Sequence, residues 1–290
     1  MRILILGAAG TLGSTVFNYL SRNSDFSAMG TVRSKKDQLH FPIALHDNLL
    51  IIEDLLDETQ LTRLLDKAKP DYVINCVGLI KQLPQASSAK LAVGVNAYFP
   101  HLLAFTCTQQ HIRLIHFSTD CVFSGLTGNY CETDQPDAED LYGRSKLLGE
   151  LVDDPLCITL RTSLIGPELE TQYSLLNWFL AQKNSVKGYQ NTFFSGLTTL
   201  EIAKVLEKIM LSPQKLHGLY HLSAARISKY DLLELIKQEY LMKIDILPDN
   251  LVVLDRSLNS DRLRTQLGYV PPSWKTLIQE MHAFQQGLQV

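Results

Sequence analysis

Residues 2–13 read Arg2-Ile3-Leu4-Ile5-Leu6-Gly7-Ala8-Ala9-Gly10-Thr11-Leu12-Gly13. The first five of them form a short, largely apolar run, which is typical of a strand buried on both faces of a parallel sheet. A glycine-rich turn follows directly, and residues 15–20 then place apolar side chains at helical spacing. In that context the glycines allow a tight turn and the close approach of a pyrophosphate to the helix N-terminus. An ordinary glycine turn is the alternative interpretation.

A basic residue stands where the second strand of such a fold ends. Residues 28–32 read as a strand and lead into Arg33, twenty positions past Gly13. Folds that bind NAD carry an acidic residue about 20 positions on for the ribose 2′-OH, whereas an arginine accommodates the 2′-phosphate of NADP. Arg33 therefore favours NADP(H), with NAD(H) as the second choice. A solvated basic turn is the alternative.

The next apolar runs predict further strands of the same sheet. Residues 49–52, 71–78 and 112–117 read as buried strands, and the last is followed by Ser118-Thr119-Asp120. In open α/β sheets, ligands bind outside the carboxyl ends of the strands. We therefore expect the glycine turn, Arg33, Asn75 and Thr119 to converge on one edge of the sheet.

A tyrosine and a lysine follow at helical spacing. Tyr142 and Lys146 are four residues apart, so on a helix they share one face. A neighbouring cation lowers the pKa of a phenol, which is ordinarily near 10. Bringing that pKa near neutrality takes about 4 kcal/mol, so a second positive group, such as an oxidised nicotinamide, would assist the lysine. Taken alone, the pair also fits any exposed helix.

Four motifs in this order resemble those of the extended short-chain dehydrogenase/reductases. They are the glycine turn as G-x-x-G-x-x-G, residues 118–125 beside the motif S-T-D-Y-V-F-D-G, residues 142–146 as Y-G-x-S-K, and residues 256–260 beside R-P-x-N-S. Within that superfamily the chain most closely resembles the dTDP-4-dehydrorhamnose reductase group. Cys121 replaces the group's aromatic residue, Ser257 replaces its proline, and the loop 79–84 departs from its pattern. These departures lie where substrate would be contacted.

The resemblance implies roles for individual residues. Thr119 matches the residue that hydrogen-bonds the substrate oxygen, Tyr142 the proton donor, and Lys146 the lysine that binds the nicotinamide ribose. The residues expected to bind the cofactor lie in the glycine turn and near the following strand ends: Gly7, Gly10, Thr11, Leu12, Gly13, Arg33, Asp54, Leu55, Cys76, Val77, Gly78 and Asn96. The residues expected to bind substrate are Asp120, Lys187 and Arg256. No metal site is expected.

The resemblance also implies a domain organisation. We expect an α/β chain with a Rossmann-type doubly wound parallel sheet in residues 1–165, which binds NADP(H). A smaller substrate lobe is expected mainly in residues 166–290. Part of this lobe, near residues 190–222, is expected to return to the sheet domain, so the two are interleaved.

The function implied is an NADPH-dependent reductase of a nucleotide-linked 4-keto-6-deoxysugar, supplying surface polysaccharide. An NAD-dependent sugar nucleotide epimerase or dehydratase is one alternative, and Arg33 argues against it. A non-catalytic, NADP-binding regulatory subunit is another, and the intact Thr119, Tyr142 and Lys146 argue against that.

Composition narrows the partners. The 290 residues carry a formal net charge of −3, which gives no electrostatic reason to expect nucleic acid or an anionic membrane. No run of 18 apolar residues is present, and the first strand begins at residue 2, which predicts neither a spanning helix nor a signal peptide. The five cysteines are scattered, as in a reduced cytoplasmic protein. The expected partner is a sugar nucleotide, and a homodimer is the assembly considered.

Overall fold

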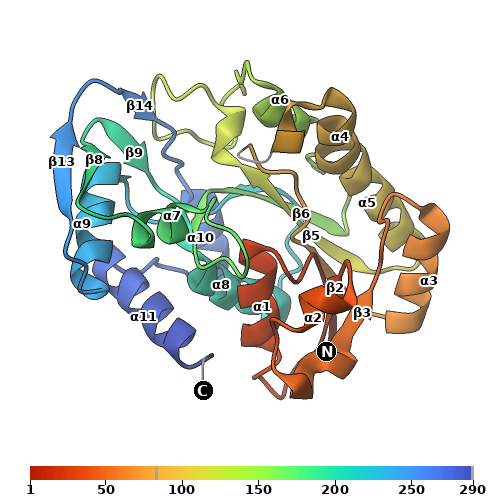
Figure 1. The fold of residues 1–290 in the computed structure, drawn as a ribbon. Helices are drawn as coiled ribbons and strands as arrows, with labels where there is room; N and C mark the ends of the chain where they lie inside the picture. The colour runs from red at the N-terminus through yellow and green to blue at the C-terminus, as the bar shows by residue number, and fades with distance from the viewer. Residues whose placement is uncertain (82–83, 289–290) are drawn as a thin grey trace.

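A seven-stranded parallel sheet forms the centre of the computed structural model, which describes residues 1–81 and 84–288 (Figure 1). The strand order is β11-β6-β5-β4-β1-β2-β3, and every neighbouring pair is parallel. The bounds are β1 (Arg2–Leu6), β2 (Ser27–Val32), β3 (Leu49–Ile51), β4 (Tyr72–Asn75), β5 (Arg113–Thr119), β6 (Cys157–Thr162) and β11 (Gly218–His221). The order reverses between β1 and β4, so the predicted doubly wound sheet is confirmed.

Helices cover both faces of this sheet because β1 alternates its side chains between two cores. Ile3 and Ile5 face a core that includes α1 (Thr11–Leu20) and α8 (Thr199–Leu211). Leu4 and Leu6 face the opposite core, with α3 (Glu58–Ala68) and α5 (Phe99–Gln109). All four β1 side chains are fully buried, as expected for a strand of a sheet covered on both sides.

The remaining strands and helices complete the fold, and many of them lie beside the sheet, around α9 in Figure 1. The remaining strands are β7 (Leu164–Ile165), β8 (Ser185–Tyr189), β9 (Thr192–Phe194), β10 (Leu197–Thr198), β12 (Ile227–Ser228), β13 (Asp245–Asp249) and β14 (Leu254–Asp255). The helices are α2 (Lys35–Gln38), α4 (Ala89–Val93), α6 (Leu141–Leu148), α7 (Leu175–Leu180), α9 (Lys229–Glu239), α10 (Asp261–Leu267) and α11 (Trp274–Gln286). The shorter helical turns are η1 (Ile43–Asn48), η2 (Pro84–Ser87), η4 (Asp120–Val122) and the π-helical η3 (Gly94–Tyr98). The chain re-enters the main sheet with β11, while the division near residue 165 stays a prediction.

Several element boundaries differ from the sequence-based expectation. The segment 71–78 is expected to be a strand that ends in a small polar turn; the strand itself covers Tyr72–Asn75, and the residues after it form a loop at the sheet edge. The strand expected over 112–117 instead runs to Thr119, which makes Thr119 its last residue. In the departing loop 79–84, Gln82 and Leu83 lie outside the described residues.

One helical run, residues 89–109, is long and apolar enough by length and composition to cross a membrane, although the sequence has no unbroken apolar stretch of that length. Within its most apolar window, 56% is buried inside the fold. Phe99, Leu103 and Cys107 pack into the core on the α3 side of the sheet. The apolar character of this run is therefore that of a core helix.

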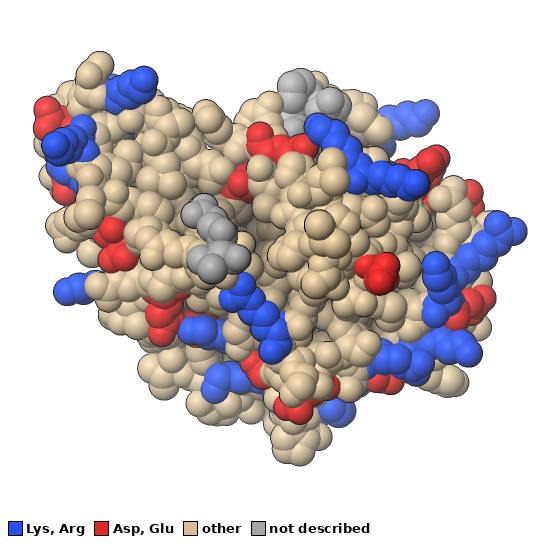
Figure 2. Space-filling model, turned by 60° about the horizontal axis from the view of Figure 1, so that its bottom comes forward, with Lys and Arg blue, Asp and Glu red and all other residues tan. Residues whose placement is uncertain are grey.

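Charged side chains are mixed over the face shown in Figure 2, where Lys and Arg alternate with Asp and Glu. The described residues of this face show no broad field of one sign, in keeping with the small net charge of −3. Such a surface provides little long-range attraction for a polyanion.

Candidate active site

A cavity of about 530 Å³ opens at the carboxyl ends of β1, β2 and β4. Nine of the twelve residues predicted to bind the cofactor line it: Gly7, Gly10, Thr11, Arg33, Asp54, Leu55, Cys76, Val77 and Gly78. These residues come from four separate strand ends, which the parallel topology brings to one edge. The cavity is therefore the candidate dinucleotide site.

The glycine turn shapes one end of this cavity. Gly7 has φ +76°, a conformation that side chains rarely adopt, and a Cβ on Gly13 would lie 2.1 Å from the carbonyl oxygen of Gly7. Gly10 is the N-cap of α1 and supplies no side-chain cap. The first N–H groups of α1 thus remain available to an anion, as a pyrophosphate site requires.

Three predicted cofactor residues do not line the cavity. Leu12 and Gly13 are buried in packing between the turn, α1 and the sheet. Asn96 is 1% exposed; its Oδ1 accepts from the N–H of Leu79 at 2.8 Å and its Nδ2 donates to Ser145 Oγ at 3.2 Å. Asn96 therefore ties the loop after β4 to α6, and its cofactor role stays a prediction.

The basic end of the cavity begins at Arg33. Its backbone N–H donates to Asp37 Oδ2 at 3.1 Å, in a capping box that starts α2. The exposed guanidinium has no hydrogen-bond or ion-pair partner in the described part of the chain. An anionic group of a ligand can therefore approach Arg33 without breaking an existing contact.

The structure brings two of the three predicted catalytic residues close together. Thr119 ends β5 and is 6% exposed, and its Oγ1 donates to Asp120 Oδ1 at 3.2 Å. The Thr119 hydroxyl is also near enough to Tyr142 to lower the pKa of that phenol. Thr119 Oγ1 also accepts from the N–H of Cys121 at 3.1 Å. Lys146 lies one turn beyond Tyr142 on α6, and its Nζ donates to the carbonyl oxygen of Phe117 at 2.6 Å. The ammonium thus binds β5 rather than the phenol.

The electrostatics of Tyr142 differ from the sequence-based expectation. Burial raises the pKa of the phenol well above its ordinary value, Cys121 raises it further, and the nearby Thr119 hydroxyl lowers it by less. The expected lowering by Lys146 is wrong for this structure, because desolvation outweighs any attraction from that ammonium. Burial also lowers the pKa of Lys146 to about 8, with the Glu150 carboxylate opposing.

This burial of Lys146 predicts a pH-dependent stability. We expect Lys146→Met to raise the unfolding free energy at pH 7 by about 2 kcal/mol, since the desolvation cost of about 3 kcal/mol exceeds the lost hydrogen bond. The folded-state pKa, about 8, lies below the ordinary 10.5, so the wild-type chain regains this stability as pH rises from 8 to 10.5. Urea unfolding of both proteins across that range measures the difference, which should shrink with pH. A difference that does not change with pH would contradict the prediction.

Charged groups gather on the substrate side of Thr119. Asp120 is 8% exposed, and burial raises the pKa of its carboxyl while Arg256 and then Lys229 oppose. Arg256 donates from Nε to the carbonyl oxygen of Phe123 at 2.8 Å, and its Nη1 lies 3.7 Å from Cys121 Sγ. Two of the predicted substrate residues, Asp120 and Arg256, are therefore brought together beside Thr119.

The third predicted substrate residue lies elsewhere, and one unpredicted residue takes a place nearby. Lys187 is on β8, where its side chain is 66% exposed and pairs with Asp249 at 2.9 Å. Lys229, the first residue of α9, is half-buried, and its Nζ lies 4.4 Å from the ring centroid of Phe194. Lys229 is part of no motif that the sequence analysis could use. Its charge acts on Asp120, so Lys229 joins the candidate site.

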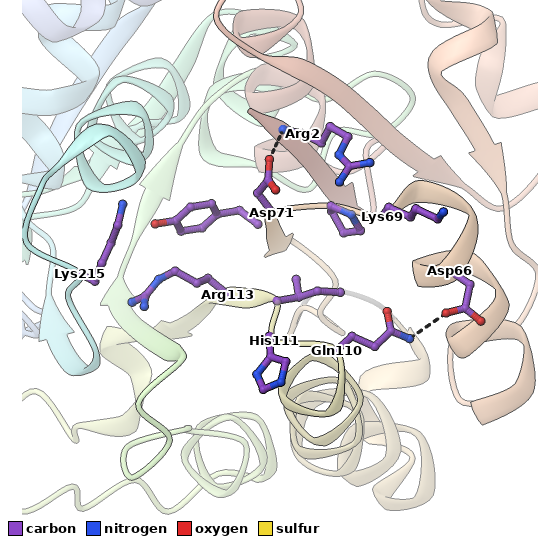
Figure 3. A pocket seen from close by; sticks show the side chains of 11 residues that line it. Arg2, Asp66, Lys69, Asp71, Gln110, His111, Arg113 and Lys215 are labelled. Carbon is purple, nitrogen blue, oxygen red and sulfur yellow. Dashed lines mark hydrogen bonds between the residues drawn. The ribbon is translucent and has the colours of Figure 1, made fainter.

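A second depression, of about 680 Å³, lies at the amino ends of the strands (Figure 3). Arg2, Asp71 and Arg113 line it, at or next to the first residues of β1, β4 and β5. Lys69 follows the C-terminus of α3, where positive charge is favoured by the helix dipole. None of the predicted site residues lies there, and ligands of such sheets bind at the opposite ends.

Known proteins resemble this chain over part or all of its length. The family model described as RmlD substrate binding domain matches residues 1–285. A probable low-salt glycan biosynthesis reductase of Haloferax volcanii is 37% identical over 57% of this chain, and the match spans about half, 54%, of that relative. A dTDP-4-dehydrorhamnose reductase of Aggregatibacter actinomycetemcomitans is 25% identical over 98% of this chain and 99% of its own.

A solved structure matches over almost the whole length. The dTDP-4-dehydrorhamnose reductase of Bacillus anthracis, solved in complex with NADP, has a TM-score of 0.78 and covers 98% of this chain and 99% of its own. Its sequence identity is 20%, so this likeness shows the fold alone.

Proposed function

The chain belongs to the RmlD substrate binding domain family, and from that membership we propose that it is an NADPH-dependent reductase of a nucleotide-linked 4-keto-6-deoxysugar. Its product would serve in surface polysaccharide synthesis, in the cytoplasm. The observation that carries the proposal is the proximity of the Thr119 hydroxyl to Tyr142 at the end of β5, at the same sheet edge as the glycine-turn cavity. The relatives, one a dTDP-4-dehydrorhamnose reductase, support the substrate class.

The residues present suit the nicotinamide dinucleotide. The open N-terminus of α1 would hold the pyrophosphate, and Arg33 the 2′-phosphate. When bound, the cofactor supplies the hydride, and the protein supplies orientation and electrostatics. Asn96 fixes the loop after β4 against α6, which links this cavity to the helix that carries Tyr142.

Tyr142 would donate a proton to the substrate oxygen as negative charge develops there. Its raised pKa keeps the phenol protonated at neutral pH, which is the form that a proton donor needs. Thr119 would share the same oxygen and stabilise the developing charge. Lys146, with a pKa lowered to about 8, still carries its charge at neutral pH and would hold the nicotinamide ribose.

A sugar nucleotide would lie on the side of Thr119 away from the cofactor. Asp120 could accept from a sugar hydroxyl, and Arg256 could donate to the diphosphate, since a guanidinium binds phosphate oxygens in pairs. Cys121 follows Asp120 in the chain and lies 3.7 Å from Arg256 Nη1, at a position where relatives of the group carry an aromatic residue. We propose that this smaller side chain changes which sugar is accepted.

One experiment separates the reductase from its alternatives. We expect the purified protein to bind NADPH reversibly and to oxidise it when a dTDP-linked 4-keto-6-deoxysugar is added, measured as loss of absorbance at about 340 nm. Nucleotide absorbance near 260 nm that dialysis does not remove would instead support an epimerase. Reversible binding without oxidation across a panel of such sugars would support a regulatory subunit.

A further inference from the structure

A segment from a distant part of the chain closes over the cofactor cavity. Residues 167–173, here called the strap, follow β7, and five of them line the cavity. These five are Glu168, Leu169, Glu170, Thr171 and Tyr173. The strap therefore places two carboxylates at a site whose proposed ligand carries phosphates.

The two carboxylates of the strap are held differently. Glu168 Oε2 accepts from Thr171 Oγ1 and from the N–H of Tyr173, both at 2.8 Å, so it fixes the strap from within. Its Oε1 also accepts from Thr11 Oγ1 at 3.4 Å. Glu170 has no such internal bonds in the described chain and is 42% exposed, so its side chain is free to swing away.

Glu170 meets the basic end of the cavity. Its Oε1 lies 2.8 Å from His40 Nε2 and 3.1 Å from Lys36 Nζ. Lys36 is three residues past Arg33, on α2, and both Arg33 and His40 line the cavity. The carboxylate thus sits among the groups that would face a phosphate next to Arg33.

We propose that Glu170 is an internal competitor for the 2′-phosphate of the cofactor, and that Lys36 and His40 extend the subsite begun by Arg33. This inference rests on the proposed function. NADPH would have to displace Glu170 from both partners, whereas the 2′-OH of NADH would donate to the carboxylate and leave it in place. Glu170 therefore weakens the preference for NADPH that Arg33 alone would give.

The displacement is feasible because the contacts are exposed. Lys36 is 76% exposed and Glu170 42%, so solvent screens their attraction. A phosphate brings up to two negative charges and three acceptor oxygens, against one charge on the carboxylate. The phosphate of bound NADPH therefore displaces Glu170 from Lys36 and His40. Breaking these contacts weakens the apparent affinity for NADPH.

The test is the ratio of the dissociation constants for NADPH and NADH, measured by nucleotide fluorescence at low salt with the full chain. Glu170→Gln should tighten NADPH binding about three- to tenfold and leave NADH binding unchanged or weaker. Lys36→Gln and His40→Ala should each weaken NADPH binding and spare NADH. Glu280→Gln is the matched control, since Glu280, on α11, is 43% exposed, pairs with Lys204 of α8 and does not line the cavity.

A ratio in Glu170→Gln within twofold of the wild-type ratio would overturn the inference, as would equal changes for both nucleotides. Because nucleotide binding is measured without a sugar substrate, the result does not depend on whether the protein reduces that sugar. A shifted ratio without sugar reduction overturns only the proposed function, whereas a protein that binds neither nucleotide overturns both.

Discussion

Replacing Tyr142 by phenylalanine should lower the turnover of the proposed reaction by about 10²–10⁴-fold, the usual contribution of a positioned proton donor. The change removes one hydroxyl, which lies near Thr119 and whose raised pKa keeps it protonated at neutral pH. The aromatic ring of residue 142 still packs as before. Neither Tyr142 nor Thr119 lines the cofactor cavity. The fold and the affinity for NADPH should therefore stay close to those of the wild type. Steady-state rates with a 4-keto sugar nucleotide measure the loss.

A second tyrosine offers a control for the same atomic change. Tyr98 lies in η3, is 50% exposed and donates to Glu58 Oε1 at 3.2 Å, outside the candidate site. Tyr98→Phe removes an equivalent hydroxyl and should leave turnover unchanged. Near wild-type turnover in Tyr142→Phe would rule out the assigned proton donor, whereas unaltered kcat with a raised KM would make Tyr142 a substrate-binding residue only.

The parallel sheet was predictable because its strands carry local patterns. In β1 the apolar run reflects burial on both faces, with Ile3 and Leu4 fully buried in opposite cores. Once the sheet is parallel, residues at strand ends must share an edge, so Gly7, Arg33 and Val77 line one cavity although they are far apart in sequence. The strand topology alone was therefore enough to predict this cofactor cavity.

The rest of the site depends on contacts between distant segments that leave no local pattern. The strap reaches the cavity through Glu168 and Glu170. Glu168 contacts Thr11, although the two residues are 157 positions apart in the chain. Lys229 is ordinary as the first residue of a helix, and only the packing of α9 brings it to Asp120. Conversely, Lys187 is expected from the sequence to bind substrate, but β8 pairs with β13 and places Lys187 beside Asp249.

The pKa of Tyr142 was mispredicted for a physical reason. Spacing on a helix fixes which side chains share a face, but it does not fix how much water remains around them. Lys146 is 6% exposed and donates its hydrogen bond to the carbonyl oxygen of Phe117. Burial is therefore the largest influence on the pKa of both Tyr142 and Lys146. An oxidised nicotinamide, which the proposed reaction forms only after hydride transfer, would add the second positive group that the spacing argument required.

Glu150→Gln should lower the unfolding free energy by about 3–5 kcal/mol, the typical cost of breaking a buried ion pair on one side. Glu150 and Arg161 are 5% and 3% exposed at their side chains and are joined by two contacts of 2.7 Å. Glu150 Oε1 also accepts from Ser118 Oγ at 2.7 Å. The amide would leave the guanidinium buried without a counter-charge. Urea unfolding measures the loss, and a loss under about 1 kcal/mol would contradict it.

The same substitution links this buried pair to the proposed chemistry. Replacing both partners, as Glu150→Leu with Arg161→Met, should recover most of the stability, since an apolar pair needs no counter-charge. Because the Glu150 carboxylate raises the pKa of Lys146, its loss should move that pKa below its present value of about 8. Turnover that depends on charged Lys146 should then fall at a lower pH than in the wild type. The measurement is the pH dependence of turnover in Glu150→Gln. If this variant is destabilised but its turnover falls at the same alkaline pH as in the wild type, titration of Lys146 does not limit the reaction and Glu150 acts on the fold alone.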